Sequence, residues 1–140
     1  MGKSIFRVGS IIGATLAFIT GTLLPAQAGT VYYNTSGTVN ESGTLYQFQT
    51  VRWHNLGDAN WNMTSMASCG GYIDIGLRDS SGGYQVSNSL RYFGPGTRWF
   101  MQAGGTGSNL PASYYSTNAR GLGAGCGNGG AMPFYAVLFL

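Results

Sequence analysis

The sequence predicts an all-β fold, a small antiparallel β-sandwich of about seven or eight strands with one disulfide, after a cleaved signal peptide. Short apolar or alternating runs are separated throughout by turn clusters rich in glycine and serine. No segment after the first 28 residues shows the i, i+3, i+4, i+7 apolar spacing of an amphipathic helix. Residues 29–140 contain neither an internal repeat nor a linker, which predicts a single domain.

Each predicted strand is a short run bounded by turn residues. The predicted strands are 31–35, 44–53, 59–64, 71–78, 84–90, 97–103, 114–118 and 133–140. The clearest is 71–78, in which Ile73, Ile75 and Leu77 alternate with residues suited to a wetted face. The turn cluster 79–83 predicts that 84–90 returns as the second arm of a hairpin.

The last predicted strand, 133–140, is an unbroken apolar run from Phe134 to Leu140. Such runs occur where both faces of a strand are covered. An uncovered edge strand of this composition would promote aggregation. We therefore expect this strand in the middle of a sheet or beneath a bound partner.

The first 28 residues have the pattern of a secretory signal peptide. Lys3 and Arg7 precede the apolar run 8–24, and the small residues Ala26 and Ala28 stand three and one residues before the predicted cut. The apolar run is short for a membrane-spanning helix, so an uncleaved anchor is the less favoured alternative. The sequence thus predicts a secreted protein, extracellular or periplasmic, with no membrane span after cleavage.

Cys69 and Cys126 are the only cysteines, and in an oxidising compartment they are expected to form a disulfide. This bond would close a loop of about 57 residues and stabilise the fold by about 4 kcal/mol. A zinc site or a catalytic thiol is less well supported, because no histidine lies near either cysteine in the sequence. The bond would fix the glycine-rich segment 121–130, whose backbone can closely approach the protein itself or a ligand.

The charge balance argues against a nucleic-acid partner. The whole chain has a net charge of +3, and only 8% of its residues are charged. Residues 29–140 contain five arginines, four acids and no lysine, which leaves a net charge of +1. A nucleic-acid-binding protein needs a strongly basic face. The aromatic content of 14% also excludes a disordered chain.

Few side chains could act in catalysis, since His54 is the only histidine. A small hydrolase using His54 with Asp58 or Asp74 is a remote alternative, because no Gly-x-Ser-x-Gly motif accompanies them. Asp79 lies in a turn cluster, where aspartate is expected to cap backbone N–H groups. The sequence therefore predicts no catalytic residue and no cofactor.

A calcium loop is suggested by Asp58, Asn60 and Asn62, which have the spacing of the first three ligands of an EF-hand. Met63 and Cys69 occupy the positions where an EF-hand needs glycine and glutamate. The segment is therefore not an EF-hand, and no metal site is predicted. Calcium held by Asp58 and a few amide oxygens is the alternative.

Aromatic residues are more numerous than a core of this size requires, with 17 in residues 29–140. Exposed rings beside Asn, Ser, Thr and Arg suit sugar rings, and they suit protein hot spots equally well. Consecutive aromatic residues on a strand point to opposite faces, so one of each pair is expected to face outward. Core packing is the alternative for each ring. The predicted ligand-binding residues are Asn60, Trp61, Asn62, Arg91, Tyr92, Tyr114 and Tyr115.

The sequence thus predicts a secreted, non-enzymatic binding module that recognises an extracellular glycan or protein through exposed aromatic residues. The alternative is an extracellular assembly component, or an inhibitor or toxin-like effector. It would form protein contacts or an oligomer through the apolar C-terminal strand. Asn34, Asn40 and Asn62 stand in Asn-x-Ser/Thr sites, which matter only in a host that glycosylates.

Overall fold

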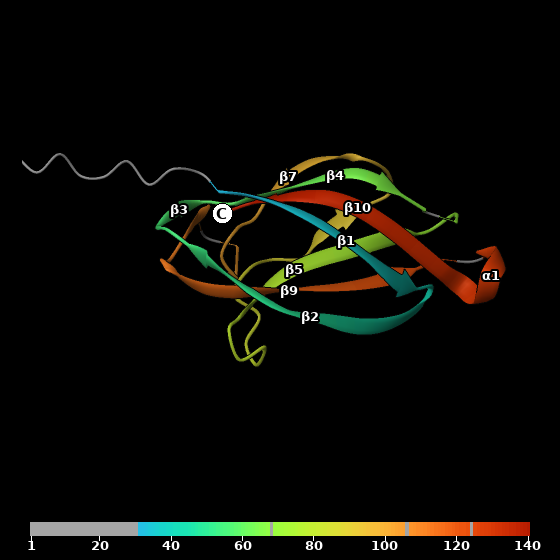
Figure 1. Ribbon diagram of the computed structural model, residues 1–140, viewed down its shortest axis with the longest axis horizontal. Coiled ribbons are helices and arrows are strands. Elements are labelled where there is room, and N and C mark those ends of the chain that lie inside the picture. Colours follow the sequence, from blue (N-terminus) through green and yellow to red (C-terminus); the bar gives the residue numbers. More distant parts are fainter. Residues whose placement is uncertain (1–30, 68, 106, 124) are drawn as a thin grey trace, which may run out of the picture.

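The computed structural model describes residues 31–67, 69–105, 107–123 and 125–140. In these residues the strands form two four-stranded antiparallel sheets, which lie as two layers (Figure 1). The fold is therefore all-β and sandwich-like, as the turn spacing predicts. The predicted signal peptide, residues 1–28, lies outside the described residues.

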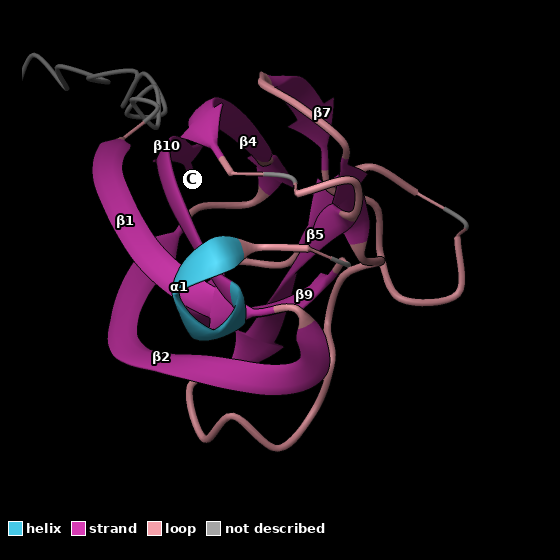
Figure 2. Cartoon of the chain, turned by 90° about the vertical axis from the view of Figure 1, so that its right-hand side faces the viewer, coloured by secondary structure: helices cyan, strands magenta, loops and turns pink. Residues whose placement is uncertain are grey.

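The two layers are named sheet A and sheet B, and Figure 2 shows them end on. Sheet A has the order β1 (Tyr32–Asn40), β10 (Ala131–Phe139), β4 (Asn60–Met66), β7 (Gly96–Trp99). Sheet B has the order β2 (Ser42–His54), β9 (Ser113–Leu122), β5 (Tyr72–Asp79), β6 (Leu90–Tyr92). A short pair joins β3 (Gly57–Asp58) to β8 (Asn109–Leu110), and the helical turn α1 (Gly127–Gly130) leads into β10.

The predicted strand 84–90 is the main difference from the sequence-based expectation. Only Gln85 and Ser87 form isolated bridges in this segment, and the paired strand β6 begins at Leu90. The segment leaves the sheet because the hydroxyl of Ser87 accepts the N–H of Leu77 at 2.9 Å, which replaces a ladder bond. The hairpin expected after 71–78 therefore forms only next to its turn, where Gln85 pairs with Arg78 and the N–H of Val86 donates to the carbonyl of Leu77, and it does not continue as a strand to Leu90. The turn itself is as predicted, since the N–H of Gly83 donates to the Asp79 carboxylate at 2.9 Å.

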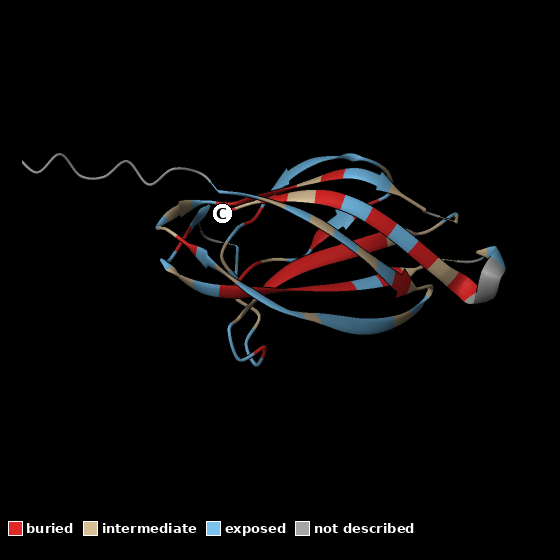
Figure 3. Cartoon of the chain, viewed as in Figure 1, coloured by how far each residue is buried: buried red, intermediate tan, exposed pale blue. Residues whose placement is uncertain are grey.

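The core lies between the two sheets and follows the alternation of the strands (Figure 3). Ile73, Ile75 and Leu77 are fully buried, as their spacing in β5 predicts. Glycine is required at one inward position of β1: a Cβ at Gly37 would lie 2.7 Å from the ring of Phe48 and 2.8 Å from that of Phe134. Because Gly37 has no side chain, the rings of Phe48 and Phe134 from the two sheets can pack against its backbone, which produces the dense packing of a protein interior.

The C-terminal strand β10 lies between β1 and β4, which confirms the expected place in the middle of a sheet. Its inward residues are buried, from Met132 to Leu138. Its outward residues are not covered by the other described residues: Tyr135 is 61% exposed, and Val137 and Phe139 are half-buried. The described residues therefore cover only one face of β10, and sheet A has an aromatic outer surface.

The predicted disulfide between Cys69 and Cys126 is confirmed, with the two Cα atoms 5.0 Å apart. It links the turn before β5 to the glycine-rich segment after β9. That segment packs against the protein itself, because the backbone N–H of Cys126 donates to the Glu41 carboxylate at 3.0 Å. The N–H of Glu41 in turn donates to the carbonyl of Gly130 at 2.9 Å. The segment is thus held at the β1–β2 turn.

Candidate functional site

The outer surface of sheet A combines exposed aromatic rings with amides and hydroxyls. Cross-strand pairing places its residues in rows that run across the sheet. We call this surface the aromatic–amide face and define it by Tyr32, Asn34 and Ser36 of β1, Tyr135, Val137 and Phe139 of β10, Asn62 and Thr64 of β4, and Thr97 and Trp99 of β7. None of these positions holds Asp, Glu, Lys or Arg, so this face offers ring surfaces and neutral hydrogen-bonding groups.

The register of β1 explains which of its polar groups face outward. Asn34 and Ser36 alternate with Thr35 and Gly37, and the strand register turns the first pair toward solvent and the second toward the core. The pairs Asn34–Val137 and Ser36–Tyr135 bring each polar side chain next to an apolar one on β10. This neighbouring arrangement suits a ligand that has both hydroxyl groups and apolar C–H surfaces.

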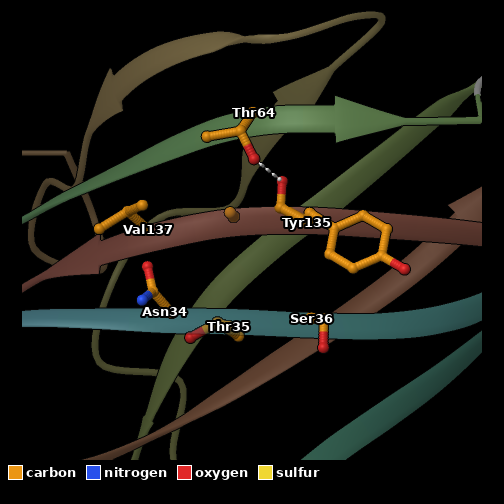
Figure 4. A pocket seen from close by; sticks show the side chains of 7 residues that line it. Asn34, Thr35, Ser36, Thr64, Tyr135 and Val137 are labelled. Carbon is orange, nitrogen blue, oxygen red and sulfur yellow. Dashed lines mark hydrogen bonds between the residues drawn. The ribbon is translucent and has the colours of Figure 1, made fainter.

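A hollow of about 360 Å³ lies in this face between β1, β10 and β4. Figure 4 shows the side chains that line it from the three strands. They are Asn34, Thr35, Ser36, Thr64, Tyr135, Ala136 and Val137. The ladder between β10 and β4 shifts register between Tyr135 and Ala136, and this bulge lies at the hollow. β-Bulges re-aim side chains, and here the bulge lies where the Tyr135 ring borders the hollow.

Within the described part of the protein, some polar groups of the hollow form hydrogen bonds, and others do not. The hydroxyl of Thr64 donates to the carbonyl oxygen of Tyr135 at 2.9 Å. The amide of Asn34 and the hydroxyl of Ser36 make no side-chain hydrogen bond to another described residue. An amide both donates and accepts, as does a hydroxyl, so these groups can bind the hydroxyls of a ligand.

Further exposed rings lie at the end of the face where the chain ends. Tyr32 contacts Phe139 edge to face, with ring centroids 4.7 Å apart. Trp99 on β7 is exposed and lies in the same cross-strand row, with Asn60 between it and Phe139. The aromatic surface therefore continues from the hollow toward a second group of rings.

Only some of the aromatic residues predicted to bind a ligand are exposed. The expectation that Trp61, Tyr92 and Tyr115 are exposed is wrong, since all three are buried in the core. Trp61 has an inward position on β4 and is fully buried, because a sandwich of this size needs its largest rings to fill the space between the sheets. Burial raises the pKa of both tyrosines. Tyr114 is exposed, as the alternation within its pair with Tyr115 predicts.

The remaining predicted residues fall on two different sheets. Asn62 lies on the aromatic–amide face, whereas Asn60, in the row between Trp99 and Phe139, is buried. Arg91 lies on the outer side of sheet B, where its guanidinium stacks 3.7 Å from the centroid of the Tyr72 ring. Tyr114 lies on that side as well, with its ring 5.0 Å from that of Trp53. The predicted set therefore does not form one site.

Sequence reasoning missed Tyr135, Asn34 and Ser36. Tyr135 lies inside the apolar run that ends the chain, and the run hides the alternation of inward and outward residues. Its one available signal is the hydroxyl, which makes Tyr135 the only side chain with a polar group between Phe134 and Leu140. Asn34 and Ser36 have no comparable signal, because Asn34, Thr35 and Ser36 are consecutive polar residues that do not alternate with apolar ones.

His54 is buried, at 2% exposure, and its Nε2 lies 3.2 Å from the carbonyl oxygen of Gly57. Burial holds the pKa of the imidazole below its ordinary value of 6.5. No carboxylate lies within ion-pair distance of His54 among the described residues, and the Asp74 carboxylate is bound by Arg91 and Arg120 instead. The described part of the chain also contains no cluster of three or more His, Cys, Asp and Glu side chains.

Comparison with known proteins identifies no relative of this chain, so its function is inferred from the geometry of the site. No model of a known protein family matches this chain, and the search of characterised proteins finds no similar sequence. In the described residues, no helix has the length and apolar character needed to cross a membrane.

Proposed function

We propose that the protein is a secreted binding module that recognises a neutral extracellular glycan through the aromatic–amide face of sheet A. The observation that carries the proposal is the exposed ring of Tyr135 beside a hollow lined by Asn34, Ser36 and Thr64. The C–H face of a sugar can stack on the ring, and the amide and hydroxyl groups can bind the sugar hydroxyls.

The alternative in which β10 itself pairs with a partner strand fits the geometry less well. Both edges of β10 are hydrogen-bonded along its length, to β1 on one side and to β4 on the other. Strand addition requires an edge with free N–H and C=O groups. A protein partner would therefore have to contact the outward side chains of this face rather than extend the sheet through β10.

The export part of the proposal rests on the N-terminal pattern and on the disulfide. A disulfide between Cys69 and Cys126 suits an oxidising compartment. N-terminal sequencing of protein recovered outside the cytoplasm is expected to begin at Gly29. A mature protein that begins at Met1 or Gly2 would contradict cleavage.

The binding test uses Tyr135→Ala against a panel of neutral polysaccharides, including cellulose, chitin, xylan, mannan and starch, in affinity electrophoresis. Retardation by at least one polysaccharide is expected, and loss of the ring should weaken it by about tenfold, which corresponds to about 1.4 kcal/mol. Tyr84→Ala is the matched control, because Tyr84 is 77% exposed in the β5–β6 connection of the other sheet. This variant should bind as the unmodified protein does.

Salt dependence separates stacking from ionic attraction. Because the face holds no charged side chain, raising NaCl from about 50 to about 500 mM should change the affinity less than twofold. The proposal fails if Tyr135→Ala binds as well as the unmodified protein. It also fails if no polysaccharide in the panel retards the protein.

A further inference from the structure

A second hollow, of about 310 Å³, lies on the outer side of sheet B, in the layer opposite the aromatic–amide face. We call it the arginine pocket. The connection from β5 to β6 runs outside sheet B, as Figures 1 and 2 show. This connection contributes Gln85 and Ser89 to the pocket lining. The main lining residues are Asp74, Gly76, Arg78, Gln85, Asn118 and Arg120.

The pocket contains a buried acid with more arginines than its charge requires. Asp74 is 4% exposed and accepts hydrogen bonds from two guanidiniums. The Nε–H and Nη2–H groups of Arg91 donate to the Asp74 carboxylate at 2.9 and 3.1 Å. The Nε–H and Nη2–H groups of Arg120 donate to the same carboxylate at 3.2 and 3.1 Å. One negative charge thus faces two positive ones, and Nη1 of each arginine makes no side-chain hydrogen bond to another described residue.

Arg78 adds a third positive charge at the same place. Its Nη1 donates to the carbonyl oxygen of Gly82 at 2.8 Å, which fixes the side chain against the turn. Its Nε is buried and has no hydrogen-bond partner among the described residues. The nearest acid in sequence, Asp79, is occupied elsewhere, because its carboxylate accepts the N–H of Gly83 and the hydroxyl of Ser81, both at 2.9 Å. Arg78 therefore has no acid partner among the described residues, and its charge at the pocket is uncompensated.

Neutral polar groups surround the charges. The amide of Asn118 donates to that of Gln85 at 2.9 Å, and this pair lies above Gly76. A Cβ at Gly76 would collide with both amides, so the glycine is needed to keep the pocket floor low. Ser89 lies at the exposed rim, and the half-exposed Leu45 contributes apolar surface.

We propose that the arginine pocket binds a carboxylate-bearing sugar, a uronic acid residue, as a site separate from the aromatic–amide face. The planar guanidiniums match a carboxylate, and one carboxylate offsets the net charge of +1 left by the lining residues Arg78, Arg120 and Asp74. Arg91, which also binds Asp74, adds a further positive charge next to the lining. The amides and the Ser89 hydroxyl suit ring hydroxyls, and Leu45 suits a C–H face. The volume of about 310 Å³ fits a single ring. The proposal does not depend on the function of sheet A.

The test follows the arginine Nε–Hε signals of ¹⁵N-labelled protein by NMR during titration with glucuronate. Glucose supplies the same ring without the carboxylate, and acetate supplies the carboxylate without the ring. Saturable shifts of the Arg78 and Arg120 signals are expected with glucuronate. Glucose and acetate should each bind at least tenfold more weakly, and the glucuronate affinity should fall as NaCl rises, because the contact is ionic.

Two variants test the pocket itself. Arg78→Gln should weaken glucuronate binding at least tenfold, whereas Arg98→Gln removes the same charge from β7 in sheet A and should leave binding unchanged. Ser89→Trp fills the exposed rim without removing an internal hydrogen bond of the Ser89 side chain, so it tests the site if loss of Arg78 disturbs folding.

Three results would overturn the proposal. The first is the absence of a saturable shift of the Arg78 signal at millimolar glucuronate. The second is equal glucuronate affinity in the unmodified protein and in folded Arg78→Gln or Ser89→Trp. The third is that acetate or glucose binds as tightly as glucuronate. Either result would show that the pocket does not recognise the carboxylate and the sugar ring together.

Discussion

The hydroxyl of Tyr92 donates a 2.6 Å hydrogen bond to the backbone carbonyl oxygen of Trp61. Tyr92 belongs to β6 of sheet B, and Trp61 belongs to β4 of sheet A, so this bond joins the two layers through the core. Both side chains are buried. The aromatic residues that the sequence suggests as a binding surface are therefore part of the contact between the sheets.

Replacing Tyr92 with phenylalanine should lower the free energy of unfolding by about 1 kcal/mol, because the ring remains and one buried hydrogen bond is lost. Urea unfolding measures the change. Tyr84→Phe, at an exposed tyrosine, is the control and should leave the stability unchanged within about 0.5 kcal/mol. Equal stability of Tyr92→Phe and the unmodified protein would show that the inter-sheet bond contributes nothing net.

Removing the disulfide with Cys69→Ser and Cys126→Ser should destabilise the fold by about 4 kcal/mol, as expected for a closed loop of 57 residues. The main reason is the larger conformational entropy of the unfolded chain. Urea unfolding of the double variant, and of the reduced unmodified protein, should give matching losses. A loss below about 1 kcal/mol would mean that the glycine-rich segment is held by other contacts, such as those of Glu41.

The fold could be predicted from the sequence further than the site could. Alternation in 71–78 and the two cysteines are local signals, and they correctly predict β5 and the disulfide. The exposure of an aromatic ring is a tertiary property, because it depends on which strand face meets the other sheet. Trp61 and Tyr135 illustrate this: the ring among asparagines is buried, and the ring in an apolar run is exposed. No short-range pattern distinguishes these two environments.

Replacing Asp74 with asparagine should lower the free energy of unfolding by about 2 kcal/mol, because Arg91 and Arg120 lose their shared carboxylate. The loss stays below the range for fully buried ion pairs, since the two arginine side chains are 47% and 45% exposed and water screens them. Thermal unfolding measures the change. Asp58→Asn, at an exposed acid, is the control and should change the stability by less than about 0.5 kcal/mol. Equal effects of the two substitutions would contradict a structural role for Asp74.

His54 should make the stability depend on pH below about 6.5. Burial lowers the pKa of the folded imidazole below its ordinary value of 6.5, so the unfolded chain binds a proton at a pH where the folded chain does not. The contribution of the neutral ring is complete above pH 6.5 and is lost as the pH falls from that value toward the folded pKa. The loss cannot exceed about 1.4 kcal/mol per pH unit for a single proton.

His54→Gln should flatten the pH dependence of the urea midpoint across this range, whatever its effect on stability at pH 7.5. Asp79 does not interfere, because hydrogen bonding, led by the Ser81 hydroxyl, lowers the pKa of its carboxyl below the ordinary value of 3.8. Its contribution is therefore lost only at more acidic pH, as the carboxyl becomes protonated. The same slope in His54→Gln and in the unmodified protein would assign the pH dependence to groups other than the buried imidazole.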